Sequence, residues 1–290
     1  MHIKFREVGY SVHNPILKDI DLAFQPGTIV ALVAPNGMGK STLFKGIMNS
    51  LVNVKGDICL QNHNYNYPLT EGNRVDIYQQ ISLMVDQKDL IGYKTGREHI
   101  NFARQNWNSQ ILSDEVIDLL KMSDYVDKKV SQYSLGMKQR LCLAMQLATD
   151  TPIMLMDEVM NSLDIVNVDL ISNILINLRE KGKIIIIASH LLDNLSLYSD
   201  TVIFIKSKDE IIQIDTDKLE KILTLFMRKN HTLSKTFGKA LFSEPFKNKF
   251  QINIDQITMD DIVEYMNHPM IRTVSVGDKS ITDYYHEFYL

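Results

Sequence analysis

The segment with the clearest chemistry runs from residue 30 to residue 44 and reads VALVAPNGMGKSTLF. Its end, GKST from Gly39 to Thr42, closes the phosphate-binding loop pattern GxxxxGK[ST]. In such a loop, successive backbone N–H groups point at a triphosphate and the following helix presents its positive end. The sequence therefore predicts an ATP site, although Ala34 stands where the pattern has its first glycine.

The residues after Ala34 decide whether the loop can still bind a nucleotide. Gly37 and Gly39 must allow close backbone approach or unusual φ values, and both are present. Lys40 would reach the β- and γ-phosphates, and Ser41 would place its hydroxyl on Mg²⁺. A methyl group at position 34 is tolerable if the backbone there stays in a region open to non-glycine residues. A dinucleotide-binding turn is the rival interpretation, but these glycines do not fit GxGxxG. The expected ATP ligands of the loop are Asn36, Gly37, Gly39, Lys40, Ser41 and Thr42.

A second acidic motif lies downstream in PIMLMDE, residues 152–158. The apolar run predicts a buried strand that ends at Asp157, whose carboxylate could hold the Mg²⁺ shell. Glu158 follows directly and could position a water for attack on the γ-phosphate. A strand that simply ends in solvated acids is the alternative for this motif taken alone. The two motifs together favour a nucleotide-hydrolysing site.

The elements between the motifs predict an α/β domain. A strand is expected at TIVALVA and a helix at residues 41–50, which gives the strand, loop and helix that the motif requires. A β-like region follows, with GDICL and ISLMVDQ, and then helical patterns at REHINFARQNW, at SDEVIDLLKM with Ser113 as N-cap, and at GMKQRLCLAMQLA. The apolar runs PIMLMD and KIIIIASH predict parallel strands covered by helices. A helical subdomain is therefore expected at about residues 90–150.

The segment YSLGMKQRL, residues 133–141, resembles the signature motif of ATP-binding cassette (ABC) transporter ATPases. Four further residues match that family in order: Tyr10 resembles the aromatic residue that stacks on adenine, and Gln87 the Q-loop glutamine. Asp164 in NSLD resembles the D-loop aspartate, and His190 the switch histidine. The resemblance covers about residues 1–210. It implies a P-loop NTPase fold with a helical insertion and an antiparallel β subdomain.

The resemblance also implies roles for particular residues. The catalytic residues would be Glu158, His190, Lys40 and Gln87. The Mg²⁺ ligands would be Ser41, Gln87 and Asp157. Tyr10, Ser134, Gly136 and Asp164 would join the loop residues as nucleotide contacts. The signature departs from the family's LSGGQ at Leu135 and Met137, and Val159 replaces the usual proline, but no catalytic group is lost. These departures are expected to alter turnover, not to abolish it.

In this family two ATPase domains close head to tail, so that Ser134 and Gly136 of one contact the ATP on the Lys40 loop of the other. The resemblance thus implies a homodimer or a pair with a related ATPase subunit, together with a separate transmembrane permease. Single-domain ATPases of this length with a C-terminal extension resemble those of bacterial exporters of drugs, antimicrobial peptides or peptide toxins. The sequence YSLGMKQR is frequent in that group, within which the chain resembles the ATPase of a staphylococcal exporter of amphipathic phenol-soluble modulin peptides. A soluble ABC ATPase acting on ribosomes or nucleic acid is the alternative, while a small-molecule kinase would not explain the signature or His190.

The composition and the N-terminal sequence indicate where in the cell the protein works. The 290 residues have a formal net charge of -4 and a pI near 6.1, so the charge gives no indication of nucleic-acid binding. The N-terminus lacks a signal peptide's apolar core, and no run reaches the roughly 18 apolar residues that span a bilayer. Cys59 and Cys142 belong to no CxxC pair or metal spacing, which favours free thiols in a reducing compartment. We expect a peripheral protein at the cytoplasmic face of a bacterial membrane, bound there only through its partner.

The last part of the chain is predicted to form a domain of its own. We expect the ATP-binding domain over residues 1–212 and a small α/β extension over residues 213–290. Residues 221–250 contain seven Lys or Arg and one acid, whereas residues 251–290 contain two basic residues and seven acids. Two solvated faces would explain this asymmetry. The alternative is that the opposite charges meet, within the extension or across a dimer, and keep two subunits together.

Overall fold

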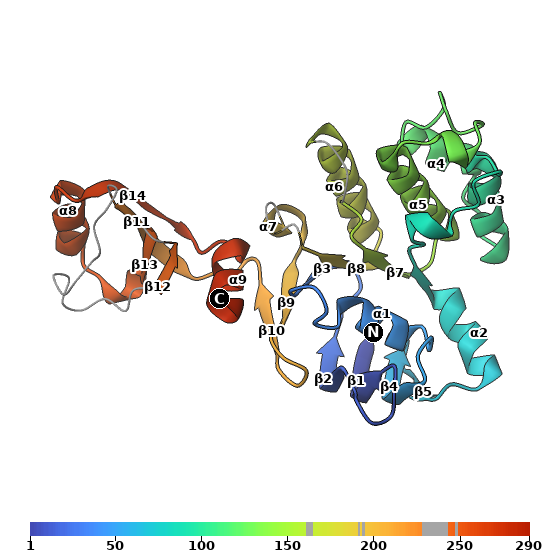
Figure 1. Ribbon diagram of the computed structural model, residues 1–290, viewed down its shortest axis with the longest axis horizontal. Coiled ribbons are helices and arrows are strands. Elements are labelled where there is room, and N and C mark those ends of the chain that lie inside the picture. The colour runs from blue at the N-terminus through green and yellow to red at the C-terminus, as the bar shows by residue number, and fades with distance from the viewer. Residues whose placement is uncertain (161–164, 191, 193–194, 228–242, 247–248) are drawn as a thin grey trace. The chain divides into compact units, whose positions relative to one another are not determined.

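The computed structural model describes residues 1–160, 165–190, 192, 195–227, 243–246 and 249–290. These residues form two compact units, Met1–Gln213 and Ile214–Leu290 (Figure 1). None of the described helices is both long and apolar enough to cross a bilayer. Cys59 and Cys142 are both free, and Cys142 is buried.

A six-stranded sheet forms the centre of the first unit, in the order β10-β9-β3-β8-β7-β6. Its strands are β3 (Thr28–Val33), β6 (Ile81–Leu83), β7 (Ile153–Asp157), β8 (Ile184–Ser189), β9 (Thr201–Ile205) and β10 (Ile211–Asp215). β3 pairs in parallel with β8 and β9, and β7 pairs in parallel with β6 and β8. Every residue of β8 is buried, as the apolar run predicted for a strand covered on both faces. The carboxyl ends of β3, β7 and β8 therefore lie at the same edge of the sheet.

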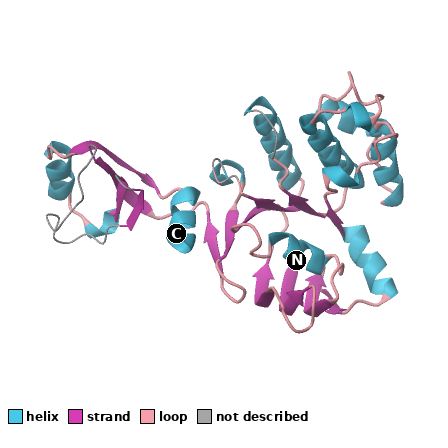
Figure 2. Ribbon diagram, viewed as in Figure 1, coloured by secondary structure: helices cyan, strands magenta, loops and turns pink. Residues whose placement is uncertain are grey.

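Helices cover both faces of this sheet (Figures 1 and 2). α1 (Lys40–Ile47) lies on one face, and α5 (Leu135–Thr149) and α6 (Ile165–Glu180) lie on the other, with the short α7 (Leu195–Tyr198) preceding β9. Phe44 and Ile47 of α1 are fully enclosed in a core that also contains residues of β3 and β8. This packing fixes the start of α1 at the end of β3.

A second, antiparallel sheet packs into the same core. It has the order β2-β1-β4-β5, with β1 (His2–Gly9), β2 (Leu17–Ala23), β4 (Asn53–Leu60) and β5 (His63–Tyr67). Ile3, Phe5 and Val8 of β1 are buried in the cluster that includes Phe44. The antiparallel β subdomain that the family resemblance implied is thus present.

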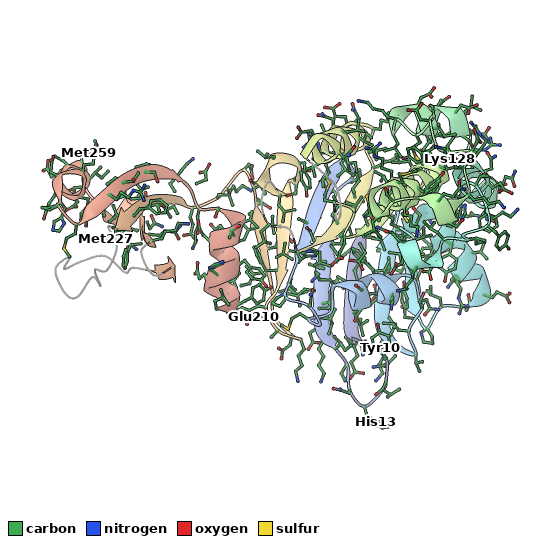
Figure 3. All side chains as sticks on the ribbon, turned by 45° about the horizontal axis from the view of Figure 1, so that its top comes forward. Tyr10, His13, Lys128, Glu210, Met227 and Met259 are labelled. Atoms are coloured by element: carbon green, nitrogen blue, oxygen red, sulfur yellow. The ribbon has the colours of Figure 1, made fainter. Side chains whose placement is uncertain are left out.

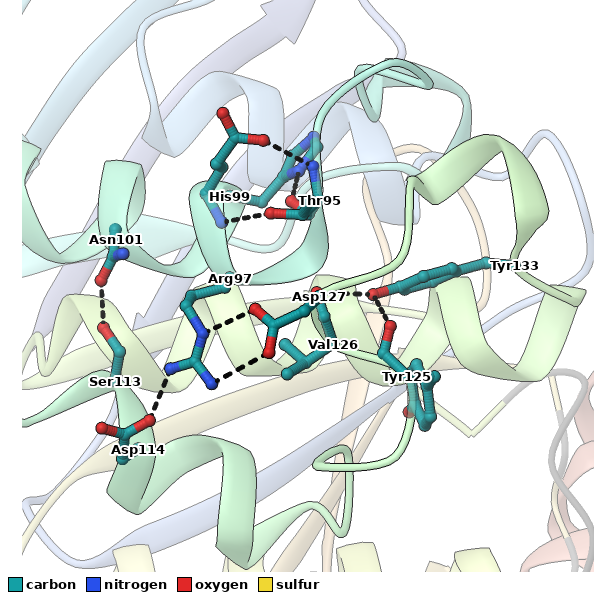
Figure 4. Close-up of polar contacts among 11 residues, drawn as sticks. Thr95, Arg97, His99, Asn101, Ser113, Asp114, Tyr125, Val126, Asp127 and Tyr133 are labelled. Carbon is teal, nitrogen blue, oxygen red and sulfur yellow. Dashed lines mark hydrogen bonds and ion pairs between the residues drawn. The ribbon is translucent and has the colours of Figure 1, made fainter.

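The helical subdomain contains α3 (Gly96–Asn106), α4 (Ser113–Leu119) and the beginning of α5. Thr95 caps α3 through a complete capping box with Glu98. The sequence-based prediction that Ser113 caps α4 is wrong: the N-cap is Leu112, and the Ser113 hydroxyl donates a 2.6 Å bond to Asn101 Oδ1 instead (Figure 4). The helix begins one residue earlier than predicted, which leaves this hydroxyl free to join α4 to α3.

Tyr133, just before α5, bonds the segment that follows α4. Its buried hydroxyl donates to the carbonyl oxygens of Tyr125 and Val126, at 3.0 and 3.2 Å (Figure 4). Gly96 lies directly beside it, and a Cβ built at that position would collide with the hydroxyl oxygen. The close approach of Tyr133 therefore requires a glycine at position 96.

The helix between β5 and β6 was not predicted. α2 (Glu71–Gln80) lies within the segment that the sequence assigned to a β-like region. Thr70 caps it by accepting a bond from the Asn73 N–H, and of its ten residues Ile77 alone is buried. A helix with one buried residue has no apolar stripe, so its periodicity gave no helical signal.

The described residues of the second unit form a four-stranded sheet with two helices. The sheet has the order β12-β13-β11-β14, from β11 (Lys221–Met227), β12 (Ser243–Phe246), β13 (Lys249–Asn253) and β14 (Ile271–Asp278), and its helices are α8 (Met259–Asn267) and α9 (Ile281–Tyr289). Basic and acidic side chains of this unit pair: Lys221 with Asp278 and Lys249 with Asp283, each at 2.5 Å. Opposite charges from the two halves of the extension thus meet within it.

Candidate functional site

A cleft of about 1350 Å³ opens where β3 and β7 end. Its walls come from the loop after β3, the start of α1, the segment after β6 and the end of β7. The predicted residues that line it are Tyr10, Asn36, Gly37, Gly39, Lys40, Ser41, Thr42, Gln87, Asp157 and Glu158. The fold thus brings together side chains that lie more than a hundred positions apart in the sequence.

The loop before α1 has the backbone of an anion-binding loop. Gly37 has φ 84° and Gly39 has φ 107°, values that side-chain-bearing residues rarely adopt. A Cβ at Gly39 would lie 3.0 Å from Leu17 Cδ2. Gly39 caps α1 without a side-chain hydrogen bond, and the first turn carries no acid. The first N–H groups of the helix and its positive end are therefore available to a phosphate.

Ala34 has a backbone conformation that residues other than glycine can adopt. The described non-glycine residues with positive φ do not include Ala34, and its side chain is 2% exposed within the core. Its carbonyl oxygen accepts a 2.6 Å bond from Lys40 Nζ, and the Lys40 side chain is buried. Burial lowers the pKa of Lys40, while the carboxylates of Asp157 and Glu158 oppose this effect. In this structure the Lys40 side chain thus binds the loop's own backbone at Ala34.

Ser41 and Asp157 form the part of the site that fits Mg²⁺. The Ser41 hydroxyl donates a 2.6 Å bond to Asp157 Oδ2. Burial raises the pKa of Asp157 and the charge of Glu158 adds to this, whereas the Ser41 bond lowers it. The described residues hold no cluster of three His, Cys, Asp or Glu side chains that could bind a metal unaided. A hydroxyl beside one partly desolvated carboxylate is the donor set of an ion that takes its other ligands from phosphates and water.

Glu158 and His190 face one another. His190 Nδ1 lies 3.0 Å from Glu158 Oε1, and both side chains keep part of their surface in solvent. Glu158 has φ 55°, a left-handed conformation that costs a residue with a side chain about 1–2 kcal/mol. Its N–H donates a 2.8 Å bond to the Ala188 carbonyl of β8, which helps to hold it there.

A residue that the sequence did not single out, Gln139 of α5, contacts both sides of the site. Gln87 Nε2 donates to Gln139 Oε1 at 2.5 Å, and Gln139 Nε2 donates to the carbonyl oxygens of Glu158 and Val159 at 2.9 and 3.1 Å. Gln139 is 4% exposed. The available signal was an amide at an otherwise apolar, buried helix position, which implies fixed partners.

Tyr10 lines the cleft and follows directly after β1 (Figure 3). It is exposed, at 54%. Lys45 of α1, which the sequence did not single out, contacts it: Nζ lies 3.3 Å from the Tyr10 hydroxyl and 5.5 Å from the ring centre. An aromatic ring with a cation beside it is a suitable surface for a nucleobase and for nearby phosphate charge.

The signature residues take a different position from the loop residues. Ser134 caps α5 by accepting a 3.2 Å bond from the Met137 N–H, and the first turn of α5 carries no acid. Among the described residues that line the cleft, α5 contributes Leu135, Lys138 and Gln139, while Ser134 and Gly136 are not included. Leu135 is 65% exposed. Asp164 lies outside the described residues.

Comparisons with known proteins agree with this arrangement. The family model described as ABC transporter matches residues 17–161, half of the chain. The energy-coupling factor transporter ATP-binding protein EcfA of aster yellows witches'-broom phytoplasma is 34% identical over 214 residues, 71% of this chain and 72% of its own length. The lantibiotic transport ATP-binding protein SrtF of Streptococcus pyogenes is 28% identical over 214 residues, 73% of this chain and 89% of its own.

Solved structures confirm the predicted fold class. CbiO1 from Clostridium perfringens, described as part of the ABC transporter complex cbiONQ, has a TM-score of 0.62 and 25% identity. The likeness covers 74% of this chain and 88% of that one. The chain therefore belongs to the ABC transporter family, in which it is an ATP-binding subunit and an ATPase.

Proposed function

We propose that this ATPase powers the export of peptides or drugs through a separate membrane subunit. Two observations support export. One is the sequence of residues 133–140, YSLGMKQR, and the other is the similarity to SrtF, a lantibiotic transport protein. Amphipathic peptide toxins of the phenol-soluble modulin type are the cargo class that the sequence resemblance favours. Other relatives, such as EcfA, serve differently named systems, so the family alone does not decide the direction of transport.

The contacts around the cleft support the assigned roles. The observation that carries these roles is that Ser41 bonds Asp157 while His190 contacts Glu158, the next residue in the chain. Lys40 and the N–H groups at the start of α1 would bind the β- and γ-phosphates. Glu158 would accept a proton from the attacking water or orient it, and His190 would hold the Glu158 carboxylate in place.

Mg²⁺ would be held by Ser41, Asp157 and Gln87. When bound, it would supply positive charge to the phosphate oxygens as the bond to the γ-phosphate breaks. The hydroxyl of Ser41 and the carboxylate of Asp157 are already adjacent, so they would need to separate only enough to admit the ion. Gln87 lines the same cleft and would contribute its amide oxygen.

The site as described is open, and we propose that a second subunit closes it. Ser134 and Gly136 do not line their own chain's cleft, and the start of α5 has a positive end without neighbouring acid. The start of α5 from a partner could therefore approach the γ-phosphate and exclude water. The partner would be a second copy of this chain or a related ATPase subunit.

We propose that the membrane subunit holds this ATPase at the cytoplasmic face of the cell membrane. The permease would contact the surface between the segment that follows β6 and the helical subdomain. The C-terminal unit would serve as an accessory or dimerisation domain. Removing residues after about 215 would leave dimerisation and transport unchanged if that role is wrong.

Two measurements test the proposal. Replacement of Glu158 with Gln should lower ATP turnover by about 10²- to 10⁴-fold, the range for loss of a general base, and should allow ATP to trap a dimer on size-exclusion chromatography. An unchanged turnover would refute the role of Glu158. Purification of the full chain from membranes should recover a multispanning membrane protein with it. Cosedimentation with ribosomes and no membrane partner would instead favour the soluble alternative.

A further inference from the structure

Gln139 lies between Gln87 and the segment that begins at Glu158. It lies on α5, five residues after Ser134, and its side chain is almost fully buried. All three of its polar contacts reach residues of the site: Gln87, Glu158 and Val159. Because α5 also belongs to the helical subdomain, Gln139 connects that subdomain to the end of β7.

The partners of Gln139 determine which way its amide points. The carbonyl oxygens of Glu158 and Val159 can only accept hydrogen bonds, so the Gln139 NH₂ group must face them and both of its hydrogens are used. Its oxygen is then the group that faces Gln87, and it accepts from the Gln87 NH₂ group. This leaves the Gln87 oxygen at the other end of that amide, which is the type of ligand that Mg²⁺ takes.

The same contacts hold Glu158 in its unusual backbone conformation. Glu158 has φ 55°, and a strained residue of this kind persists only where its surroundings over-determine it. Its N–H donates to the Ala188 carbonyl at 2.8 Å, and its carbonyl oxygen accepts from Gln139 at 2.9 Å. Both peptide groups that flank the Glu158 Cα are therefore anchored, one by β8 and one by Gln139.

We propose that Gln139 is a positioning residue for ATP hydrolysis: it fixes the Glu158 backbone and sets the polarity of the Gln87 amide. This inference rests on the proposed role of Glu158, and in it Gln139 acts on the reaction only through Gln87 and Glu158. It also connects the helical subdomain directly to the backbone of Glu158. A displacement of α5 would be transmitted to Gln87 and Glu158 through one side chain.

The test compares two glutamines of the same helix. Gln139→Met removes all the hydrogen bonds with little change in shape. Gln146→Met is the matched control, because Gln146 is 2% exposed, lies two turns further along α5, and bonds Ser82 at 2.8 and 3.1 Å away from the cleft. We expect Gln139→Met to lower kcat by about 10- to 100-fold, as loss of supporting contacts does at metal sites, with KM for ATP changed less than about threefold. Both variants should lower Tm to a similar extent, because each loses the hydrogen bonds of a buried amide. Gln146→Met should nevertheless leave kcat within about twofold of wild type.

A second variant supplies a readout that a packing defect would not give. In Gln139→Glu, a protonated carboxyl can donate to the Glu158 carbonyl and accept from Gln87, whereas the ionised form has no donor. Its kcat relative to wild type should therefore rise as pH falls from about 8.5 to 6, since burial raises the pKa of a carboxyl group. Gln139→Met should show no such recovery. The expected profile would support positioning even if Gln139→Met failed to fold.

Several results would overturn the inference. A kcat for Gln139→Met equal to that of Gln146→Met would do so, as would a flat pH ratio for Gln139→Glu. A crystal structure of Gln139→Met in which Glu158 keeps its left-handed φ would also reject it, whether or not the chain hydrolyses ATP. Failure of wild-type chain to hydrolyse Mg-ATP would reject the proposed function instead, so the two failures are distinguishable.

Discussion

Restoring the first glycine of the loop should not improve this ATPase. In Ala34→Gly the protein loses a methyl group that is 2% exposed in the core, which costs about 0.8 kcal/mol. The extra backbone freedom of glycine in the unfolded chain adds about 0.5–1 kcal/mol. For a unit of this size the combined loss should lower Tm by roughly 3–6 °C. Nothing is gained in return, because Ala34 does not adopt a positive φ and its carbonyl already accepts the Lys40 bond.

The assay is thermal unfolding of the nucleotide-free chain together with turnover at saturating Mg-ATP. Ala31→Gly is the control: Ala31 is also fully buried on β3, pairs with Ile187 and Val202, and is not among the described residues that line the cleft. We expect both variants to lose Tm to a comparable extent and to keep kcat within about twofold of wild type. A several-fold rise in kcat for Ala34→Gly alone would refute the reasoning, because it would show that the methyl group obstructs the loop.

Three further variants test the site and the C-terminal unit. Lys40→Ala should weaken ATP binding at least tenfold by calorimetry, about 1.4 kcal/mol, without lowering the Tm of the free chain, because burial lowers the pKa of this amine and so disfavours its charged form. ATP affinity equal to wild type would contradict the assigned contact. Gly39→Ala should destabilise the chain by about 1–2 kcal/mol in urea unfolding, since it combines a φ of 107° with a crowded Cβ, and wild-type stability would show that the loop relaxes freely. Burial alone would raise the pKa of Asp283, but bonds from Lys249, Ser280 and Gln251 lower it overall from 3.8. The stabilisation is therefore present above about pH 4 and is lost as pH falls through the lower folded value. Asp283→Asn should cost about 3 kcal/mol at pH 7 and less at pH 3, measured by hydrogen exchange over residues 281–289, and an equal cost at both pH values would contradict the pairing.

The parts of the fold and site that follow from short segments could be predicted. The loop from Gly37 to Ser41 and the strand ending at Asp157 have local patterns, because phosphate binding and strand burial each constrain neighbouring residues. The fold brought these residues to one cleft as expected. The confirmed family membership then extends the prediction to the surrounding architecture.

The missed features depend on contacts between distant segments. The left-handed φ of Glu158 is held by β8 and α5, and neither element is adjacent to it in the chain. Gln139 and Lys45 are polar residues on helices whose partners become visible only when Gln87 and Tyr10 are brought beside them. Ser113 looked like an N-cap by residue type, but Asn101 offered its hydroxyl a partner from another helix. Such competition cannot be read from residue type and spacing.

The contact between Tyr133 and Gly96 has a consequence for how this chain can change over evolutionary time. The tyrosine hydroxyl fills the space above the glycine, so a side chain at position 96 becomes possible only after a smaller residue such as leucine has replaced Tyr133. The reverse order would pass through an intermediate with two groups in one place. The two positions should therefore covary among relatives, and a laboratory attempt to convert Tyr133 back to the family's leucine should succeed in the presence of Gly96. In a relative with a side chain at position 96, tyrosine at position 133 would be blocked until position 96 became glycine.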